Sequence, residues 1–269
     1  IGCPQQNYTA DCPGDNVQYL VCHDGLTLHD CIAYNAGLDE QKPAQKKELI
    51  ARIKLGNALL LTSQGIAFLH AGQERGRTKP NIHNAAEECT GVFVRNSYDS
   101  SDSINRIVWT LDEAYTELLA YTRGLIDLRK QHNLFRIGDT QRIAQAAAFL
   151  PLDAVPSVHT DIGGAAGDGA EECTQAGAGT TACPQALAGD NGNTALAFGY
   201  TIDWEDGTWY LLFNASGTKQ SFIPQREVKN PAVFVDGATA SPSGIKNAVG
   251  IQFEKNRIIV DPYTAVVFR

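Results

Sequence analysis

The most constraining feature of the sequence is a long helical segment between two short apolar runs. Residues 17–22, VQYLVC, and residues 66–70, IAFLH, have the length and composition of short buried strands. Between them, residues 42–65 place Pro43 in a first helical turn, carry apolar residues on one broad face and end at Gly65. A strand, a helix and a second strand in this order predict a parallel α/β unit.

Two further segments belong to this half of the chain. Residues 71–109 are mostly polar with little periodicity, and a loop of such length in a compact domain is usually functional. A second long helix is expected over residues 110–133, where Thr110 and Glu113 have the spacing of a capping box.

From about Leu134 the pattern changes to short β-type runs separated by Gly, Asn, Asp and Pro. These runs are TALAFGY, TWYLLFNA, AVFVDG, GIQFEK, RIIV and YTAVVF. The sequence therefore predicts an α/β part over residues 1–133 and an all-β domain over residues 134–269. Within the second part, a Gly/Ala-rich stretch at about 153–193 is too poor in large apolar residues to form a core of its own. We interpret it as a surface insertion.

Length and charge narrow the class of protein. The chain has 269 residues, of which 43% are hydrophobic, which is enough for a sizeable core. The net charge of -8 and the pI near 5.2 disfavour a nucleic-acid or anionic-membrane surface. No apolar run approaches the roughly 20 residues that span a bilayer. The chain begins at Ile1 and contains no Met, so we expect a processed product or, preferably, a piece of a longer polypeptide.

The cysteines form neither CxxC pairs nor the Cys/His clusters of a zinc site. Cys3 with Cys12 and Cys173 with Cys183 are close in sequence within loop-like surroundings, which favours two local disulfides in an oxidising compartment. The alternative is that all the cysteines are reduced thiols. Cys22 lies inside the first apolar run and is expected to be a small buried hydrophobe.

Polar residues that follow the two expected strands are candidates for a site. His23 and Asp24 come directly after the first strand, and His70, followed by AGQERGRTK, ends the second. Because sites in parallel α/β sheets form at the C-terminal ends of strands, these residues belong to one face. An Asp beside a His can hydrogen-bond a polar substrate and stabilise positive charge that develops on it. The alternative is a polar pair that only caps the strand.

Three segments carry a specific resemblance. The segment VQYLVCHDGLTLHD resembles the last of the short signature regions of the α-amylase superfamily of glycoside hydrolases. The segments LTSQGIAFLHAGQERGRTK and NSYDSSDSINRIVW resemble the type I pullulanase and limit-dextrinase branch of that superfamily. The likeness covers residues from about 17 to 135, and the β domain that follows fits the family's C-terminal domain in length, in position and in its YLLFNAS strand.

The resemblance implies a fold class of α/β plus all-β. The chain would hold the seventh and eighth strands of a (β/α)8 barrel with their helices, followed by a C-terminal β-sandwich. It also implies a retaining mechanism with an Asp nucleophile and a Glu acid/base on earlier strands. No segment here resembles the regions that carry them, so both would lie upstream of Ile1. A quarter of a barrel exposes its sheet edge, so we expect the chain to need the N-terminal portion of the same enzyme as its partner.

By this resemblance, His23 hydrogen-bonds sugar hydroxyls, and Asp24 is the third carboxylate, which stabilises the oxocarbenium-like transition state. The family usually has Asn where this chain has Gly25, which removes a hydrogen-bonding side chain beside the pair and puts the loop conformation in question.

Further substrate-binding candidates lie in the polar region. Glu74 and Arg77 could shape sugar-binding subsites at the mouth of the barrel, or form an ion pair that only braces the loop. Asn, Asp and Tyr side chains on a loop suit recognition of sugar hydroxyls, and the resemblance places RNSYDSSDSIN beside the glucose units on the non-reducing side of the cut. These candidates are Asn96, Tyr98, Asp99, Asp102 and Asn105. In the β domain, Trp204 and Trp209 are expected to be core residues and not sugar-stacking platforms.

Other polar residues are interpreted as structural. His29 and Asp30 repeat the His-Asp dipeptide, but in an amphipathic segment that leaves the site. The spacing of His23, His29 and His83 matches no compact metal motif, so we expect no metal site in this chain.

The resemblance therefore predicts that the chain is the C-terminal part of a secreted or periplasmic starch-debranching glycoside hydrolase. Such an enzyme would cleave α-1,6 bonds in pullulan, limit dextrin or amylopectin. Its partner would be an α-glucan polysaccharide, with no nucleic acid and no membrane, and we expect a monomer. No cofactor is expected in this chain, and the sequence leaves open whether the parent enzyme binds calcium. The alternative is a non-catalytic α-glucan-binding or scaffolding protein that retains barrel remnants and a β-sandwich.

Overall fold

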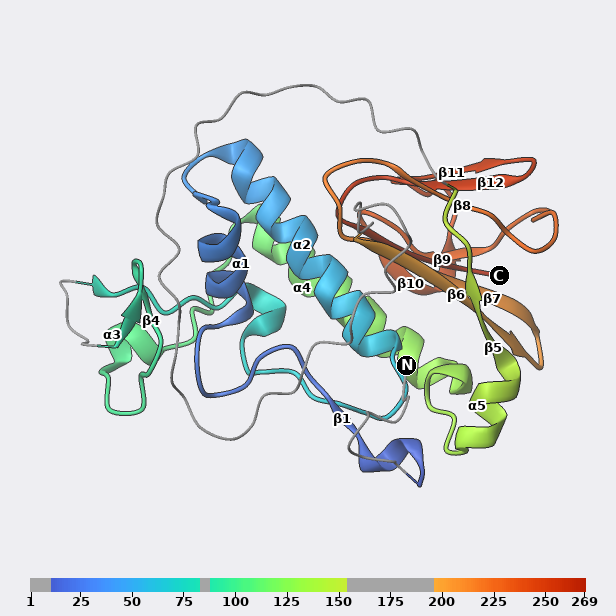
Figure 1. Cartoon of the computed structure of the whole chain (residues 1–269). Coiled ribbons are helices and arrows are strands. Elements are labelled where there is room, and N and C mark those ends of the chain that lie inside the picture. The colour runs from blue at the N-terminus through green and yellow to red at the C-terminus, as the bar shows by residue number, and fades with distance from the viewer. Residues whose placement is uncertain (1–10, 83–87, 154–195) are drawn as a thin grey trace, which may run out of the picture.

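The computed structural model describes residues 11–82, 88–153 and 196–269, in which helices and sheets are stacked in layers (Figure 1). Two long helices, α2 (Pro43–Thr62) and α4 (Glu113–Gln131), pack against one face of a six-stranded sheet. A three-stranded sheet packs against the opposite face. The long helices and the large sheet therefore share one hydrophobic cluster, while a second cluster lies between the two sheets and a third lies among α1 (Leu28–Ala36), α2 and α4.

The parallel unit forms as the sequence predicts, but its strands are short. Strand β1 (Val17–Gln18) pairs in parallel with β2 (Ile66–Ala67), and α2 lies between them in the chain. The expectation of buried strands over residues 17–22 and 66–70 is wrong for this chain, because Val17 is 52% exposed and Ile66 is 51% exposed. Within the described residues, this sheet has only two strands, so neighbouring strands do not extend the ladder or cover its apolar side chains.

Two helix starts depend on short polar side chains. Helix α1 (Leu28–Ala36) begins after Thr27, whose Oγ1 accepts a hydrogen bond from the backbone N–H of Asp30 at 3.2 Å. Helix α4 begins after Asp112, which accepts from the backbone N–H of Tyr115 at 3.0 Å. The expected cap at Thr110 is therefore wrong, because the carboxylate of Asp112 takes the acceptor position next to the first helical turn.

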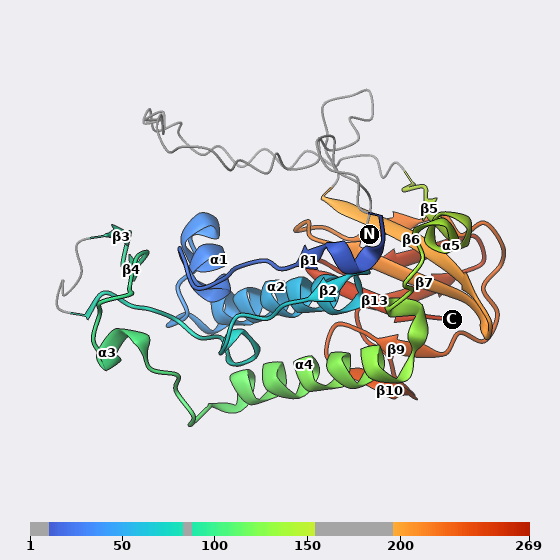
Figure 2. The ribbon, with the colours of Figure 1, turned by 90° about the horizontal axis from the view of Figure 1, so that it is seen from below.

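The region expected to be a long polar loop contains short elements of its own. A turn of 3-10 helix, η2 (Gln73–Arg75), follows β2 closely. A small hairpin of β3 (Cys89–Thr90) and β4 (Phe93–Val94) and the short helix α3 (Asp102–Asn105) come next. The hairpin and α3 project from the helical part at the end away from the sheets (Figure 2).

The change to strands comes slightly later than Leu134. Helical segments η4 (Asn133–Phe135) and α5 (Thr140–Ala146) precede the first strand of the large sheet. Another 3-10 turn, η1 (Pro13–Asp15), precedes β1.

The two antiparallel sheets have a defined strand order. In spatial order the large sheet holds β10 (Ala240–Ile245), β9 (Val233–Val235), β13 (Thr264–Phe268), β7 (Gly207–Asn214), β6 (Ala197–Trp204) and β5 (Ala147–Leu150). The small sheet holds β11 (Ile251–Glu254), β12 (Arg257–Val260) and β8 (Gln220–Phe222).

All strand pairings in these two sheets are antiparallel. In the large sheet, β13 and most of β7 are buried on both faces. In β7, Trp209, Leu211 and Phe213 face the helices, while Tyr210 and Leu212 face the small sheet. This alternation explains why the strand reads as a continuous apolar run. Trp209 has no exposed surface, which confirms it as a core residue, while Trp204 is only partly buried.

The cysteine predictions are tested only in part. Cys3, Cys173, Cys183 and nearly all of the expected Gly/Ala-rich insertion lie outside the described residues. Among the described residues, Cys12, Cys22 and Cys31 form no disulfide. Cys22 is only half-buried, because β1 ends before it. No helix in the described ranges is both long and apolar enough to cross a membrane.

Candidate functional site

The turn after β1 presents His23 and Asp24 to solvent. Their side chains are 85% and 82% exposed, and Nε2 of His23 lies 3.3 Å from Oδ2 of Asp24. The pair follows β1, but not directly as predicted, because the strand ends at Gln18 and residues 19–22 separate it from His23. Water around a carboxylate weakens its electrostatic interaction with other charges. Asp24 can therefore stabilise a positive charge strongly only where a ligand or further protein excludes this water.

Gly25 gives this turn its shape. Its backbone has φ = 77°, in the left-handed region that Gly adopts freely and Asn adopts more readily than other residues with side chains. A β-carbon on Gly25 would meet no atom within 4 Å. An Asn, which the resemblance leads one to expect at this position, would therefore fit the backbone conformation of Gly25.

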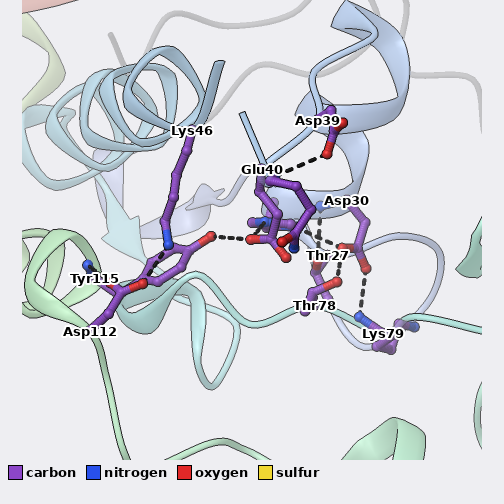
Figure 3. Close-up of polar contacts among 11 residues, drawn as sticks. Thr27, Asp30, Asp39, Glu40, Lys46, Thr78, Lys79, Asp112 and Tyr115 are labelled. Atoms are coloured by element: carbon purple, nitrogen blue, oxygen red, sulfur yellow. Dashed lines mark hydrogen bonds and ion pairs between the residues drawn. The ribbon is translucent and has the colours of Figure 1, made fainter. Parts of the chain in front are cut away.

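Buried Asp30 belongs to a group of charged and polar side chains, shown in Figure 3. His29 Nδ1 and Asp30 Oδ1 are hydrogen-bonded at 2.9 Å, and His29 Nε2 lies 3.4 Å from Oε2 of Glu40. Glu40 also accepts a hydrogen bond from the Tyr115 hydroxyl at 2.8 Å. The side chains of His29 and Asp30 are 2% and 0% exposed. They hold α1 against α4, as the structural interpretation of this dipeptide predicts.

His29 and Glu40 stabilise each other's charged form. Burial alone would lower the pKa of His29, but the hydrogen bonds to Asp30 and Glu40 outweigh it and raise this pKa to about 9. The hydrogen bond with His29 is the largest effect on Glu40, and it lowers that pKa to about 2 against the opposing effect of burial. Glu40 and Tyr115 were missed from the sequence because neither belongs to a motif.

The segment 77–79 connects three parts of the site. Nη2 of Arg77 donates to the carbonyl of Asn105 at 2.8 Å, and Nη1 donates to the carbonyl of Ala71 at 3.2 Å. The next residue, Thr78, donates its hydroxyl to Asp30. The backbone N–H of Lys79 donates to Oδ2 of Asp30 at 2.8 Å. The loop after β2 is thereby fastened to α1 and to the loop that ends at Asn105.

Glu74 and Arg77 do not form the ion pair that was one of the two alternatives. Glu74 instead accepts a hydrogen bond from the backbone N–H of Gly72 at 3.1 Å. Arg77 reaches His70, whose Nε2 lies 3.4 Å from Nη1 of Arg77. Burial, and then the positive charge of Arg77, lower the pKa of His70. Arg77 therefore braces the loops through carbonyl groups and His70.

The candidates in the 96–105 loop divide into two groups. Asn105 uses its amide N–H groups inside the loop, donating to the carbonyls of Ser97 at 2.6 Å and Ser100 at 2.9 Å. Tyr98 is 86% exposed, and Asp99 and Asp102 are also exposed. The exposed side chains are available to a ligand, whereas the amide N–H groups of Asn105 shape the loop.

One hollow joins the two predicted parts of the site. It has a volume of about 520 Å³ and is lined by Asp24, Gly25, Glu88, Arg95 and Asn96. Asp24 and Asn96, which are far apart in sequence, are thus brought to the same hollow. Glu88 and Arg95 were not among the predicted residues, although Arg95 is the first residue of the segment RNSYDSSDSIN.

The described part of the chain contains no cluster of three or more His, Cys, Asp or Glu side chains that could hold a metal ion. His83, the third member of the histidine spacing considered above, lies outside the described residues.

Comparison with known proteins supplies the family. A family model described as SpuA C-terminal matches residues 189–269. Pullulanase A of Streptococcus pneumoniae serotype 4 is 30% identical over 295 residues, and the match covers 98% of this chain and 20% of that protein. The chain belongs to the pullulanase family and corresponds to its C-terminal region. A pullulanase of Bacillus subtilis strain 168 is 36% identical over 140 residues, covering 52% of this chain and 17% of that protein.

Solved structures agree with this assignment to the pullulanase family. The catalytic module of the glycogen-degrading pneumococcal virulence factor SpuA matches with a TM-score of 0.78 at 26% identity, over 99% of this chain and 37% of that structure. The pullulanase SAP of Group B Streptococcus matches with a TM-score of 0.77 at 29% identity, over 99% of this chain and 33% of that structure. The chain thus spans about a fifth of the length of Pullulanase A.

Proposed function

We propose that this chain is the C-terminal part of a debranching glycoside hydrolase that cleaves α-1,6-glucosidic bonds in pullulan, limit dextrin, amylopectin or glycogen. The observation that carries the proposal is the His23–Asp24 turn at the end of β1, beside a hollow, in a chain that matches pullulanases along its whole length. Relatives named as pullulanases and as glycogen-degrading support this substrate class.

The remainder of the catalytic machinery belongs, in this proposal, to an upstream portion of the same protein. The exposed apolar side chains of the β1–β2 pair support it: Val17, Tyr19, Ile66 and Phe68 are 52%, 56%, 51% and 43% exposed. Further parallel strands on either side would bury these residues and complete a (β/α)8 barrel. The Asp nucleophile and the Glu acid/base would stand at the ends of those strands.

In the proposed mechanism, the upstream carboxylate attacks the anomeric carbon while the acid/base protonates the departing oxygen, and water later hydrolyses the glycosyl-enzyme. Asp24 acts where positive charge develops on the sugar ring. The negative charge of Asp24 stabilises the transition state more than the ground state, because the positive charge on the sugar ring is absent before the bond breaks. His23, next to it, donates to or accepts from sugar hydroxyls.

The polar loop would bind neighbouring sugars. Asn96 is placed nearest to the reaction, because it lines the same hollow as Asp24. We assign Tyr98, Asp99 and Asp102 to further sugar contacts on the basis of their exposure. Glu74, Arg77 and Asn105 contribute mainly by holding the loops. We expect the enzyme to act outside the cytoplasm as a monomer.

The test uses the full-length protein that contains this chain. Purified protein is incubated with pullulan, and new reducing ends are measured. The proposal predicts turnover with maltotriose as the product, which identifies cleavage at α-1,6 bonds. A folded protein that binds α-glucan saturably but releases no reducing ends would contradict it and favour the non-catalytic binding protein.

A further inference from the structure

Lys79 is a buried lysine whose ammonium group is fully occupied by neutral oxygen atoms. The residue is 1% exposed. Its Nζ donates to the carbonyl of Gly25 at 2.8 Å, to the hydroxyl of Ser97 at 3.2 Å and to the carbonyl of Arg95 at 3.3 Å. An ammonium group has three N–H bonds, so these three acceptors satisfy it completely.

The three acceptors belong to the two walls of the hollow. Gly25 directly follows Asp24 in the turn after β1, and Arg95 and Ser97 are the two neighbours of Asn96. Both Asp24 and Asn96 line the hollow. One ammonium group therefore ties the backbone beside the proposed transition-state stabiliser to the loop of the proposed sugar ligand.

The anchor of this connection is itself fixed. Asp30 accepts from the backbone N–H of Lys79 and from the hydroxyl of Thr78, and Asp30 lies in the buried first turn of α1. The lysine side chain thus extends from a rigid point. Burying a lysine without a carboxylate in hydrogen-bond contact is unfavourable. Burial is the main cause that lowers the pKa of Lys79, and the negative charges of Asp30 and Asp24, which act from a distance, oppose it. An apolar residue would fill the same space without this cost, but it would not join the two walls.

We propose that Lys79 is a positioning residue, whose ammonium group sets the distance between the turn that carries Asp24 and the loop that carries Asn96. The inference rests on the proposed function in so far as it assigns a catalytic role to Asp24. The connection between the two walls is a separate statement about the fold, and it can be tested without any activity.

Lys79→Met removes the charge and keeps most of the side-chain volume. In the full-length protein, it should lower kcat on pullulan by about 10²-fold, because a displacement of about 1 Å at a reacting centre is enough for such a loss. KM should change much less. Lys54→Met is the matched control: Lys54 is also buried, and its Nζ donates to the carbonyl of Ala238 in the β part. It should leave kcat near the wild-type value.

A double-mutant cycle distinguishes positioning from a general loss of stability. If Lys79 acts through Asp24, Lys79→Met should reduce kcat far less in an Asp24→Asn background than in the wild type. Independent, multiplicative losses would overturn the proposal. If Lys79→Met does not fold, Lys79→Gln, which keeps two N–H donors, takes its place in the same cycle.

Amide hydrogen exchange provides the readout that does not depend on activity. Lys79→Met should accelerate exchange in both residues 23–26 and residues 95–97, while Lys54→Met should leave both segments unchanged. Unchanged exchange in either segment of Lys79→Met would overturn the inference, whether or not the wild type hydrolyses pullulan. An inactive wild type with accelerated exchange in Lys79→Met would contradict the proposed function and leave the connection between the walls standing.

Discussion

Gly124 of helix α4 lies directly against Ala240 of strand β10. A β-carbon built on Gly124 would stand 1.9 Å from the carbonyl oxygen of Ala240 and 2.7 Å from its carbonyl carbon. Both atoms belong to backbone, which cannot rotate away as a side chain can. The absence of a side chain at residue 124 therefore allows the second long helix to approach the edge of the large sheet.

Gly124→Ala should destabilise the protein by about 2 kcal/mol or more, because overpacking against backbone exceeds the gain of about 1 kcal/mol in helix propensity. Gly56→Ala in α2 is the control. Its β-carbon would meet the end of the Leu20 side chain at 2.9 Å, and that side chain can move. Thermal unfolding of both variants decides the matter, and an unchanged or raised Tm for Gly124→Ala would show that the helix and sheet are not in such close contact.

The His29–Glu40 pair should make stability depend on pH in a defined window. The pKa of His29 is raised from 6.5 to about 9, so its contribution is complete below about pH 6.5 and is lost as the pH rises through 9. The pKa of Glu40 is lowered from 4.5 to about 2, so its contribution is complete above about pH 4.5 and is lost as the pH falls toward 2. The pair therefore stabilises the fold most between about pH 4.5 and 6.5.

Glu40→Gln tests this dependence, because the amide can still accept from Tyr115 but carries no charge to hold the proton on His29. The fall in Tm between pH 6.5 and 9 should become smaller in the variant than in the wild type. The control is Glu205→Gln, which breaks an ion pair at the surface: the side chain of Arg142 is 52% exposed and that of Glu205 is 77% exposed. This variant should keep the wild-type dependence of Tm on pH. Equal slopes for Glu40→Gln and the wild type would count against the pair.

Gly25→Asn should be tolerated. Asn is among the few residues that adopt left-handed backbone angles readily, and there is open space around the position. The free energy of unfolding should change by less than about 1 kcal/mol, whereas Gly25→Val should lose about 1 to 2 kcal/mol. Thermal unfolding of the two variants side by side measures the difference. Equal losses for Asn and Val would mean that the turn does not require a left-handed residue.

The strands that the sequence failed to predict share one property, which is their place in the sheets. Strands β5 and β10 are the two edges of the large sheet, and β8 is one edge of the small sheet. An edge strand needs fewer apolar residues and tolerates Pro, as the sequence ASPSGI of β10 illustrates. The other strands of the two sheets, including the edge strand β11, lie in β-type runs of the sequence and could be predicted from them.

The site could be predicted only where a motif or resemblance marked it. The turn with His23 and Asp24 and the loop with Asn96 are predicted in this way, and the structure brings Asp24 and Asn96 to one hollow. Lys79 is the last residue of the segment AGQERGRTK, but its role cannot be predicted from that segment, because it depends on acceptors 54 and 18 residues away along the chain. Glu40 could not be predicted for the same physical reason: its contacts are with His29 of α1 and Tyr115 of α4, and sequence spacing does not show which residues these helices bring to it.

The most direct test of the central claim is the kinetics of Asp24→Asn in the full-length protein on pullulan. The amide keeps the shape and hydrogen bonding of the carboxylate but loses its charge. If Asp24 stabilises charge that exists only in the transition state, kcat should fall on the order of 10²- to 10³-fold, a loss of about 3 to 4 kcal/mol, with little change in KM. Tm should stay near the wild-type value, because the side chain is 82% exposed. A near-normal kcat together with a markedly lowered Tm would make Asp24 a structural cap of β1 and contradict the proposed function of this turn.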